Sequence, residues 1–198
     1  MIKPNNYESI QTGDFTPVTP GGHHMIIRQV REQESRTGKP MLVILVDFAE
    51  NDSQPKYFSK LYESDVRPDK KWPHAGVIYV VSVDGSGQCS RNFKTFITSF
   101  ERSNGCEVVW SNGPAFCEQF RGKKIGGVYG RVEEEYNGER KTRTLLRWFC
   151  EDGRADNAKA PSDKLMDSAP AASATAVPTV PAVPEPAFTQ VDTAELPW

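Results

Sequence analysis

The sequence has few of the residues that usually bind metals or form disulfides. Its four cysteines are scattered without a CxxC pair, and two of its three histidines are adjacent, so a zinc site would need ligands from four separate segments. The sequence also lacks a signal peptide and an apolar run long enough to span a membrane. We therefore expect a cytoplasmic protein with reduced thiols, no bound metal and no cofactor.

Catalytic motifs are missing as well: there is no nucleophile motif, phosphate-binding loop or dinucleotide fingerprint. The run Glu133-Glu134-Glu135 could suggest a metal-dependent nuclease, because clustered carboxylates can hold Mg²⁺. On a strand, however, consecutive side chains point to opposite faces, so these three cannot converge. Asp47 and Glu50 end an apolar run, but no histidine or lysine stands at motif spacing beside them. We expect no enzymatic activity.

Aromatic residues are almost missing after Glu151, where proline, alanine, serine and threonine dominate. Residues 1–153 contain 21 Lys and Arg against 20 Asp and Glu, whereas residues 154–198 contain 3 against 6. Bulky apolar side chains are too sparse in the second part to offset chain entropy. The composition predicts one domain over residues 1–152 and a disordered, Pro/Ala-rich acidic tail over residues 153–198, with a solvated linker to about residue 190.

The tip of this tail differs from the linker. Its apolar end lies beside carboxylates, which suits a shallow apolar pocket rimmed by Lys or Arg on a partner protein. Five residues are predicted to bind a partner there: Asp192, Glu195, Leu196, Pro197 and Trp198.

Two β-prone runs flank Asn137-Gly138, the strongest short-range signal for a β-hairpin. A strict two-residue turn pairs Val132 with Arg143, whereas one extra residue in a bulge would place Val132 opposite Thr142 or Thr144 and Arg131 opposite Arg143. We predict the bulge, because only it separates the charged side chains from the apolar ones. Strict alternation gives the second run one basic face, formed by Lys141, Arg143, Leu145, Arg147 and Phe149.

Alternation and turn signals predict further strands, and a 3.6-residue period predicts one strong helix. This helix carries four apolar residues between Phe93 and Phe100, with Ser90 or Asn92 as N-cap and Gly105 at its end. Strands are predicted over residues 24–31, 40–50, 56–63 and 77–83, and a short helix over residues 114–120. A helix inserted before the last two strands is the plan of the OB-fold. The sequence therefore predicts a mainly β protein, an OB-fold-like five-stranded antiparallel barrel with one inserted helix and a disordered C-terminal tail.

Cations alternate with aromatic residues between residues 56 and 72, a pattern that suits evenly spaced phosphates and flat bases. Stacking contributes about 1–3 kcal/mol per base, whereas exposed cations add salt-sensitive, sequence-independent attraction. The alternative is a solvated edge strand whose tyrosines pack inward. The predicted nucleic-acid-binding residues are Lys56, Tyr57, Lys60, Tyr62, Arg67, Lys70, Lys71, Trp72, Lys123, Lys124, Tyr129, Arg131, Arg143 and Arg147.

Four segments together resemble a family of small phage and prophage proteins. They are SRTGKPMLVILVDFAE, the residues around DKKWP, NFKTFITSFERSNG and FRGKKIGGVYGRVEEEYNGERKTR, and the resemblance covers roughly residues 7–150. Some members are proposed to bind single-stranded DNA, and none of the shared motifs is catalytic. The C-terminal tip resembles the acidic peptide by which bacterial single-stranded DNA-binding proteins recruit partners, although it has only two acids and ends in Trp198 instead of phenylalanine.

These observations predict a phage or prophage protein that coats single-stranded DNA in the bacterial host during replication or recombination, recruits partners through its tip and can form homo-oligomers. Three alternatives remain. The barrel could bind protein instead, as a recombination mediator or nuclease-associated adaptor, which the near-zero net charge of residues 1–153 favours. The other two are a metal-dependent nuclease and a phage structural protein.

Overall fold

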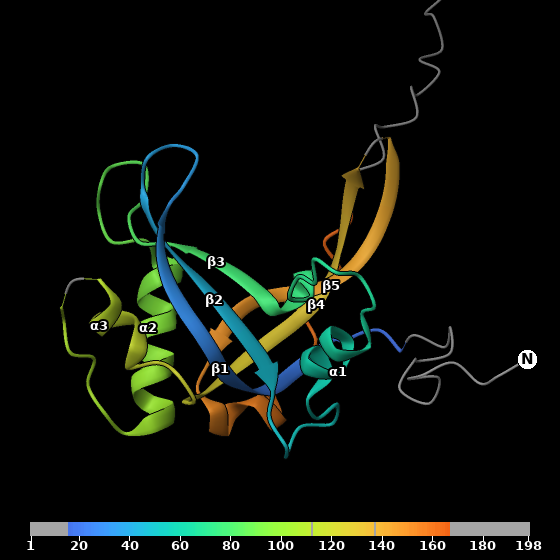
Figure 1. Cartoon of the computed structure of the whole chain (residues 1–198), viewed down its shortest axis with the longest axis horizontal. Helices are drawn as coiled ribbons and strands as arrows, with labels where there is room; N and C mark the ends of the chain where they lie inside the picture. Colours follow the sequence, from blue (N-terminus) through green and yellow to red (C-terminus); the bar gives the residue numbers. More distant parts are fainter. Residues whose placement is uncertain (1–15, 112, 137, 167–198) are drawn as a thin grey trace, which may run out of the picture. The chain divides into compact units, whose positions relative to one another are not determined.

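Five antiparallel strands form one strongly curved sheet in the computed structural model of the chain (Figure 1). The structure describes residues 16–111, 113–136 and 138–166. Along the sheet the strands follow the order β3-β2-β1-β4-β5, and their bounds are β1 (Gly21–Glu34), β2 (Pro40–Phe48), β3 (Val77–Val81), β4 (Lys124–Tyr136) and β5 (Glu139–Cys150). The predicted mainly β fold is confirmed, and so are the strands predicted over residues 24–31, 40–50 and 77–83.

Helices and 3-10 turns connect the strands: α1 (Tyr57–Ser64), η1 (His74–Gly76), α2 (Arg91–Asn104), α3 (Pro114–Glu118) and η2 (Asp152–Asn157). Along the chain, the long helix α2 follows β3 and precedes β4, as the OB-fold plan predicts. β3 and β5 are the edge strands, and within the described ranges no backbone ladder joins them, so the sheet is open along this seam. None of the described helices is long and apolar enough to cross a bilayer.

Aromatic rings fill the inner side of the sheet. Phe48 of β2, Phe58 of α1 and Tyr129 of β4 are fully buried, with ring centroids 4.9 to 6.5 Å apart. Phe96 of α2 packs against Phe120 at a centroid distance of 5.3 Å. Because each large buried side chain contributes about 1.5–3 kcal/mol, these rings account for much of the stability of the fold.

Helix α2 forms where the sequence predicts it. Ser90 is its N-cap, because its Oγ accepts a hydrogen bond from the Phe93 backbone N–H at 3.2 Å. Gly105 ends the helix with a φ of 60°, in the left-handed region that favours glycine. The short second helix is confirmed as α3, and Phe116 and Phe120 are buried.

The strand predicted over residues 56–63 is wrong, because this segment forms helix α1. The buried carboxylate of Asp47, at the end of β2, accepts hydrogen bonds from the backbone N–H groups of Phe58 and Ser59 at 2.9 and 3.3 Å. These bonds satisfy the first turn of the helix, which has no local side-chain cap. A cap supplied by another element leaves no mark in the local sequence, so alternation alone favoured a strand.

The β4–β5 hairpin follows the strict two-residue turn, so the register predicted from a bulge, with Arg131 opposite Arg143, is wrong. Val132 pairs with Arg143, and Gly138 has the positive φ of 78° that an Asn-Gly turn requires. This register also places Glu134 opposite Lys141, which favours it electrostatically.

A bulge does occur further along β5. The pairing shifts between Leu146 and Trp148, so Arg147 is the extra residue. The shift ends the strict alternation predicted for this strand: Phe149 turns into the core, with 5% of its surface exposed, and Trp148 turns outward.

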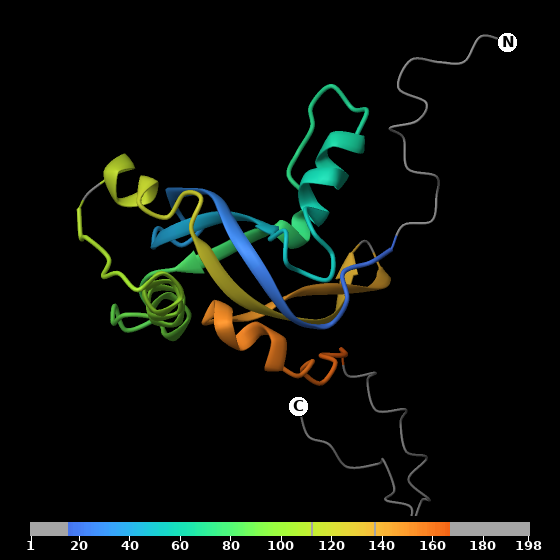
Figure 2. The same cartoon turned by 90° about the horizontal axis from the view of Figure 1, so that it is seen from below.

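Residues 153–166 pack onto the sheet, in contrast to the solvated linker predicted from residue 153. η2 lies against β1 and β4 with Ala155 buried, and Lys164 forms a parallel bridge to β4 (Figure 2). Backbone atoms make the closest of these contacts: a Cβ added to Gly22 would overlap the carbonyl oxygen of Ala155. Composition therefore did not reveal the packing, because no bulky apolar residue marks it.

Replacing Gly22 with alanine should loosen residues 152–166, because the new Cβ has no space beneath Ala155. We expect a loss of about 1–3 kcal/mol in the free energy of unfolding and faster tryptic cleavage after Lys159 and Lys164. Urea unfolding and limited proteolysis measure the two effects. Gly85→Ala is the control, since a Cβ at Gly85 meets no atom within 4 Å. Identical stability and cleavage for both variants would contradict the close packing of η2.

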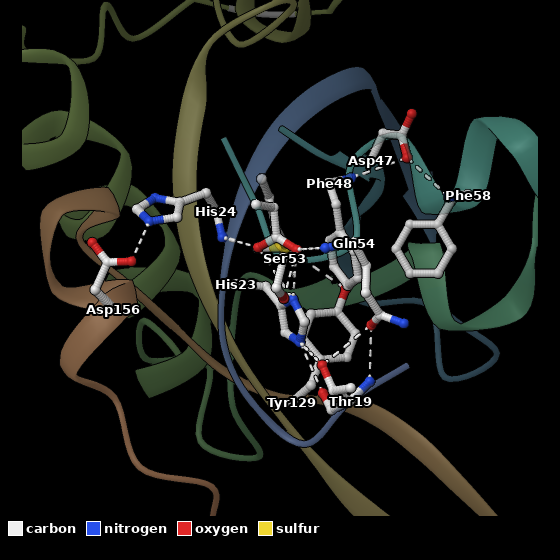
Figure 3. Close-up of polar contacts among 12 residues, drawn as sticks. Thr19, His23, His24, Asp47, Phe48, Ser53, Gln54, Phe58, Tyr129 and Asp156 are labelled. Atoms are coloured by element: carbon white, nitrogen blue, oxygen red, sulfur yellow. Dashed lines mark hydrogen bonds and ion pairs between the residues drawn. The ribbon is translucent and has the colours of Figure 1, made fainter. Parts of the chain in front are cut away.

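Adjacent histidines on β1 point to opposite sides of the sheet (Figure 3). His23 lies inside, with Nδ1 3.0 Å from the Asp52 carboxylate and Nε2 2.8 Å from the Thr19 carbonyl oxygen. Asp52 also accepts hydrogen bonds from the backbone N–H groups of His24 and Gln54, each at 2.8 Å. Burial alone would raise the pKa of Asp52, but these hydrogen bonds hold it below its usual range. The network ties the start of β1 to the segment after β2.

Candidate nucleic-acid interface

The open seam between β3 and β5 carries two exposed aromatic side chains. Tyr79 of β3 is 56% exposed and Trp148 of β5 is 45% exposed. Both line a small hollow together with Asn92 and Thr95 of α2. Exposed rings at the border of a hollow can stack on unpaired bases.

The fold determines the outward direction of both rings. Val80 and Ile78, the neighbours of Tyr79, turn to the inner side of the sheet, so the two-residue period of a strand turns Tyr79 outward. Trp148 follows the bulge at Arg147, which reverses the alternation along β5.

A second hollow lies between α2 and β5, and it adjoins the first, since Thr95 and Phe149 line both. One acidic residue lines it, Glu151, whose carboxylate lies 3.3 Å from the guanidinium of Arg154. Three cationic side chains line the same hollow: Lys94, Arg102 and Arg154. We call the two hollows together the α2–β5 track.

The α2–β5 track combines aromatic faces at one end with positive charge at the other. Among the described residues, neither Lys94 nor Arg102 forms an ion pair, so both can contact phosphates. Arg147 lines the aromatic end, and its guanidinium donates a hydrogen bond to the Ser162 carbonyl oxygen at 3.5 Å. Such a surface suits a single nucleic-acid strand, whose bases are free to stack while its phosphates meet cations.

His24 fixes η2, and with it Arg154, against the sheet. Its Nδ1 lies 2.8 Å from an Asp152 carboxylate oxygen, and its Nε2 lies 3.0 Å from Asp156, a contact drawn in Figure 3. Because a carboxylate only accepts hydrogen bonds, this geometry requires a proton on both ring nitrogens. Burial lowers the pKa of His24, but the bonds to Asp156 and Asp152 outweigh it and raise the pKa above its ordinary value.

The raised pKa predicts a pH dependence of stability. The contribution of His24 should be complete below its unfolded-state pKa of about 6.5 and should disappear as the pH rises through the higher folded-state pKa. Since Asp156 is largely exposed, we expect an effect of at most about 1 kcal/mol. Urea unfolding between about pH 6 and 8 should show this loss for the wild type. His24→Gln should flatten it, and the exposed His74→Gln should not; a wild-type slope in both variants would contradict the role of His24.

The cation-rich segment predicted to bind nucleic acid forms α1 and the loop after it. Two of its cations are neutralised by ion pairs, Lys56 with Glu50 at 2.5 Å and Arg67 with Asp65 at 2.7 Å. An exposed ion pair weakens the attraction that either cation offers to a phosphate. This segment is therefore less basic than its lysines and arginines suggest.

Three of the predicted residues in this segment do come together. The rings of Tyr62 and Trp72 lie 5.5 Å apart, and Lys70 Nζ lies 5.8 Å from the Tyr62 ring centroid. Trp72 packs on the core and donates a hydrogen bond to the Val46 carbonyl oxygen at 3.1 Å, and Tyr57 also packs on the core. The exposed predicted residues of this segment that form no ion pair with a described residue are Lys60, Tyr62, Lys70 and Lys71.

Tyr129 cannot stack on a base, because its side chain has no exposed surface. Its hydroxyl donates a hydrogen bond to the Ala75 carbonyl oxygen at 3.2 Å, and burial raises its pKa strongly. The prediction that Tyr129 contacts nucleic acid is wrong. Its place on the inner face of β4 makes it a core residue.

The basic platform predicted on the hairpin is also wrong. Arg131 pairs with Thr144, the neighbour of Arg143, so the two arginines lie on opposite faces. Both also face acids: Arg131 lies 3.9 Å from Asp163, and Arg143 lies 3.7 Å from Glu134. Only Arg147 of the predicted hairpin cations lines the α2–β5 track.

Lys123 and Lys124 are exposed at the start of β4 and do not line the track. The track also contains two exposed rings and three cations that were not predicted from the sequence: Tyr79, Trp148, Lys94, Arg102 and Arg154. Two signals could have found some of them. Tyr79 is the one aromatic residue of the apolar run over residues 77–83, and Lys94 and Arg102 lie eight residues apart on the polar side of an amphipathic helix.

The partner-binding tip predicted at the C-terminus lies outside the described residues. No model of a known protein family matches the chain, and no curated protein sequence is significantly similar to it.

Proposed function

We propose that this protein binds single-stranded DNA along the α2–β5 track and that it does so without catalysis. The observation that carries the proposal is the contiguity of two exposed rings with a cluster of cations. Tyr79 and Trp148 would stack on bases at one end, and the cations at the other end would bind phosphates. Stacked bases in a duplex do not offer their faces, so the aromatic end should favour single strands.

The local charge of the track supports the same function. The net charge of residues 1–153 is close to zero, so a general attraction to nucleic acid is weak and local clusters decide where it binds. Four cations and one carboxylate line the track. On the sequence resemblance, we place this activity in phage replication or recombination in the host cytoplasm, with residues 192–198 recruiting partner proteins.

The test is a titration of labelled oligothymidylate with the full-length protein, followed by fluorescence anisotropy at about 50 and about 200 mM salt. We expect saturable binding that weakens with salt, with a slope of roughly −2 for three phosphate contacts. A duplex of the same length should bind more weakly. Absence of saturable binding at the lower salt concentration would refute the proposal and favour the protein-binding adaptor.

A further inference from the structure

A groove of about 440 Å³ is lined by residues of the β1–β2 hairpin, of the helices α2 and α3 and of the segment between these two helices. Apolar residues line it from both sides, among them Leu42 of β2, Phe93 of α2 and Phe116 of α3. Trp110, in the segment between the two helices, also lines the groove although 66% of its surface is exposed. No residue lines both this groove and the α2–β5 track.

The groove presents Trp110 in a fixed position. Its ring stacks on Phe116 at 5.6 Å with an interplanar angle of 22°. The backbone beside it is held by Gln119, which accepts a hydrogen bond from the Val109 N–H at 2.9 Å and donates one to the Val109 carbonyl at 3.1 Å. A large exposed ring that is held in place loses little entropy on binding, which is typical of the anchor residues of protein interfaces.

The hairpin side of the groove is acidic. The inward positions of β1 change from the buried Val30 to the exposed Glu32 and Glu34, and both residues line the groove. Neither forms an ion pair with a described residue, and no described cation lines the groove. Two unpaired carboxylates therefore face an apolar surface.

We propose that this groove binds a segment of another protein in which a bulky apolar side chain stands next to Lys or Arg. The apolar side chain would pack on Trp110 and Phe93, and the cation would reach Glu32 or Glu34. The volume lies in the range of about 300–1,000 Å³ that is usual for binding sites, and is large enough for such a pair of side chains. Charge complementarity selects a basic segment over an acidic one.

Two other occupants are disfavoured by the same charges. The C-terminal tip of this chain would bring Asp192 and Glu195 next to the two glutamates of the groove. DNA would bring phosphates there. The groove thus adds a docking surface for a partner protein to the proposed function. It shares no residue with the α2–β5 track or with residues 192–198.

The test is selection of random phage-displayed peptides on the immobilised full-length protein, followed by calorimetric titration with the most enriched synthetic peptide. We expect the enriched peptides to share an aromatic residue or leucine next to Lys or Arg. Trp110→Ala should weaken binding by about 30-fold, as for an interface anchor. The double variant Glu32→Gln/Glu34→Gln, which changes only exposed side chains, should weaken binding several-fold and remove most of its salt dependence.

Three outcomes would overturn the proposal: no enrichment, enrichment of acidic peptides like the tip, or unchanged affinity in both variants. Trp148→Ala is the matched control, because it removes an exposed tryptophan on the track and should leave peptide binding intact. Conversely, Trp110→Ala should bind oligothymidylate as the wild type does. Peptide binding without DNA binding would refute the proposed function alone, and the reverse result would refute the groove alone.

Discussion

Replacing Asp52 with alanine should lower the free energy of unfolding by about 3–5 kcal/mol, as expected when one partner of a buried charged network is removed. The side chain of Asp52 is almost fully buried, and its carboxylate contacts the equally buried His23. Alanine would leave that imidazole and the backbone N–H groups of His24 and Gln54 without an acceptor. Urea unfolding near neutral pH measures the loss.

The effect of Asp52 should depend on pH in a defined direction. Because the pKa of Asp52 is lowered in the folded state, its contribution should be present above the unfolded-state pKa of about 3.8 and should be lost as the pH falls through the folded-state value. The exposed Asp69→Ala is the control and should change stability by no more than about 0.5 kcal/mol. Equal stability of the two variants would show that the network contributes nothing.

Replacing Tyr79 and Trp148 with alanine should weaken oligothymidylate binding by about 1–3 kcal/mol for each ring, which is roughly 5- to 150-fold. Stacking involves no counterion release, so the dependence of affinity on salt should stay close to that of the wild type. Both rings are exposed, so the fold should tolerate the change. Anisotropy titration at several salt concentrations measures affinity and salt slope together.

The cations provide the contrasting variant. Lys94→Ala combined with Arg102→Ala should reduce the salt slope by roughly 1.4, since each phosphate contact to a single strand contributes about 0.7. Trp110→Ala removes a ring of similar exposure outside the track and should change neither quantity. The ring variants, the cation variant and Trp110→Ala should therefore differ. The same loss of affinity and the same salt slope in all of them would contradict the division between stacking and phosphate contacts.

Local signals in the sequence predicted the parts of the fold that local physics determines. The Asn-Gly turn located the hairpin, and the apolar spacing, Ser90 and Gly105 located α2. The exceptions depend on distant partners. The α1 helix is capped by Asp47 from β2, and η2 packs on Gly22 through its backbone. Neither interaction changes the periodicity of the segment that it stabilises.

The candidate site was harder to predict than the fold. Some of the predicted cations are neutralised by nearby acids, as Arg67 shows. Some of the predicted rings are packed into the core, as Tyr129 shows. The α2–β5 track instead joins Tyr79, Lys94 and Trp148 from three elements, and the bulge at Arg147 decides which ring of β5 faces outward. A one-residue shift in register cannot be read from composition, because it depends on how both strands pack.

The most direct test of the proposed interface is photo-crosslinking of the full-length protein to oligothymidylate that carries 5-iododeoxyuridine, with the modified residues mapped by mass spectrometry. Iodouracil reacts with aromatic side chains that stack on it, so the products report which rings touch bases. The α2–β5 track predicts crosslinks at Tyr79 and Trp148. Crosslinks confined to Tyr62 or Trp110, or their absence under conditions where the oligonucleotide binds, would contradict it.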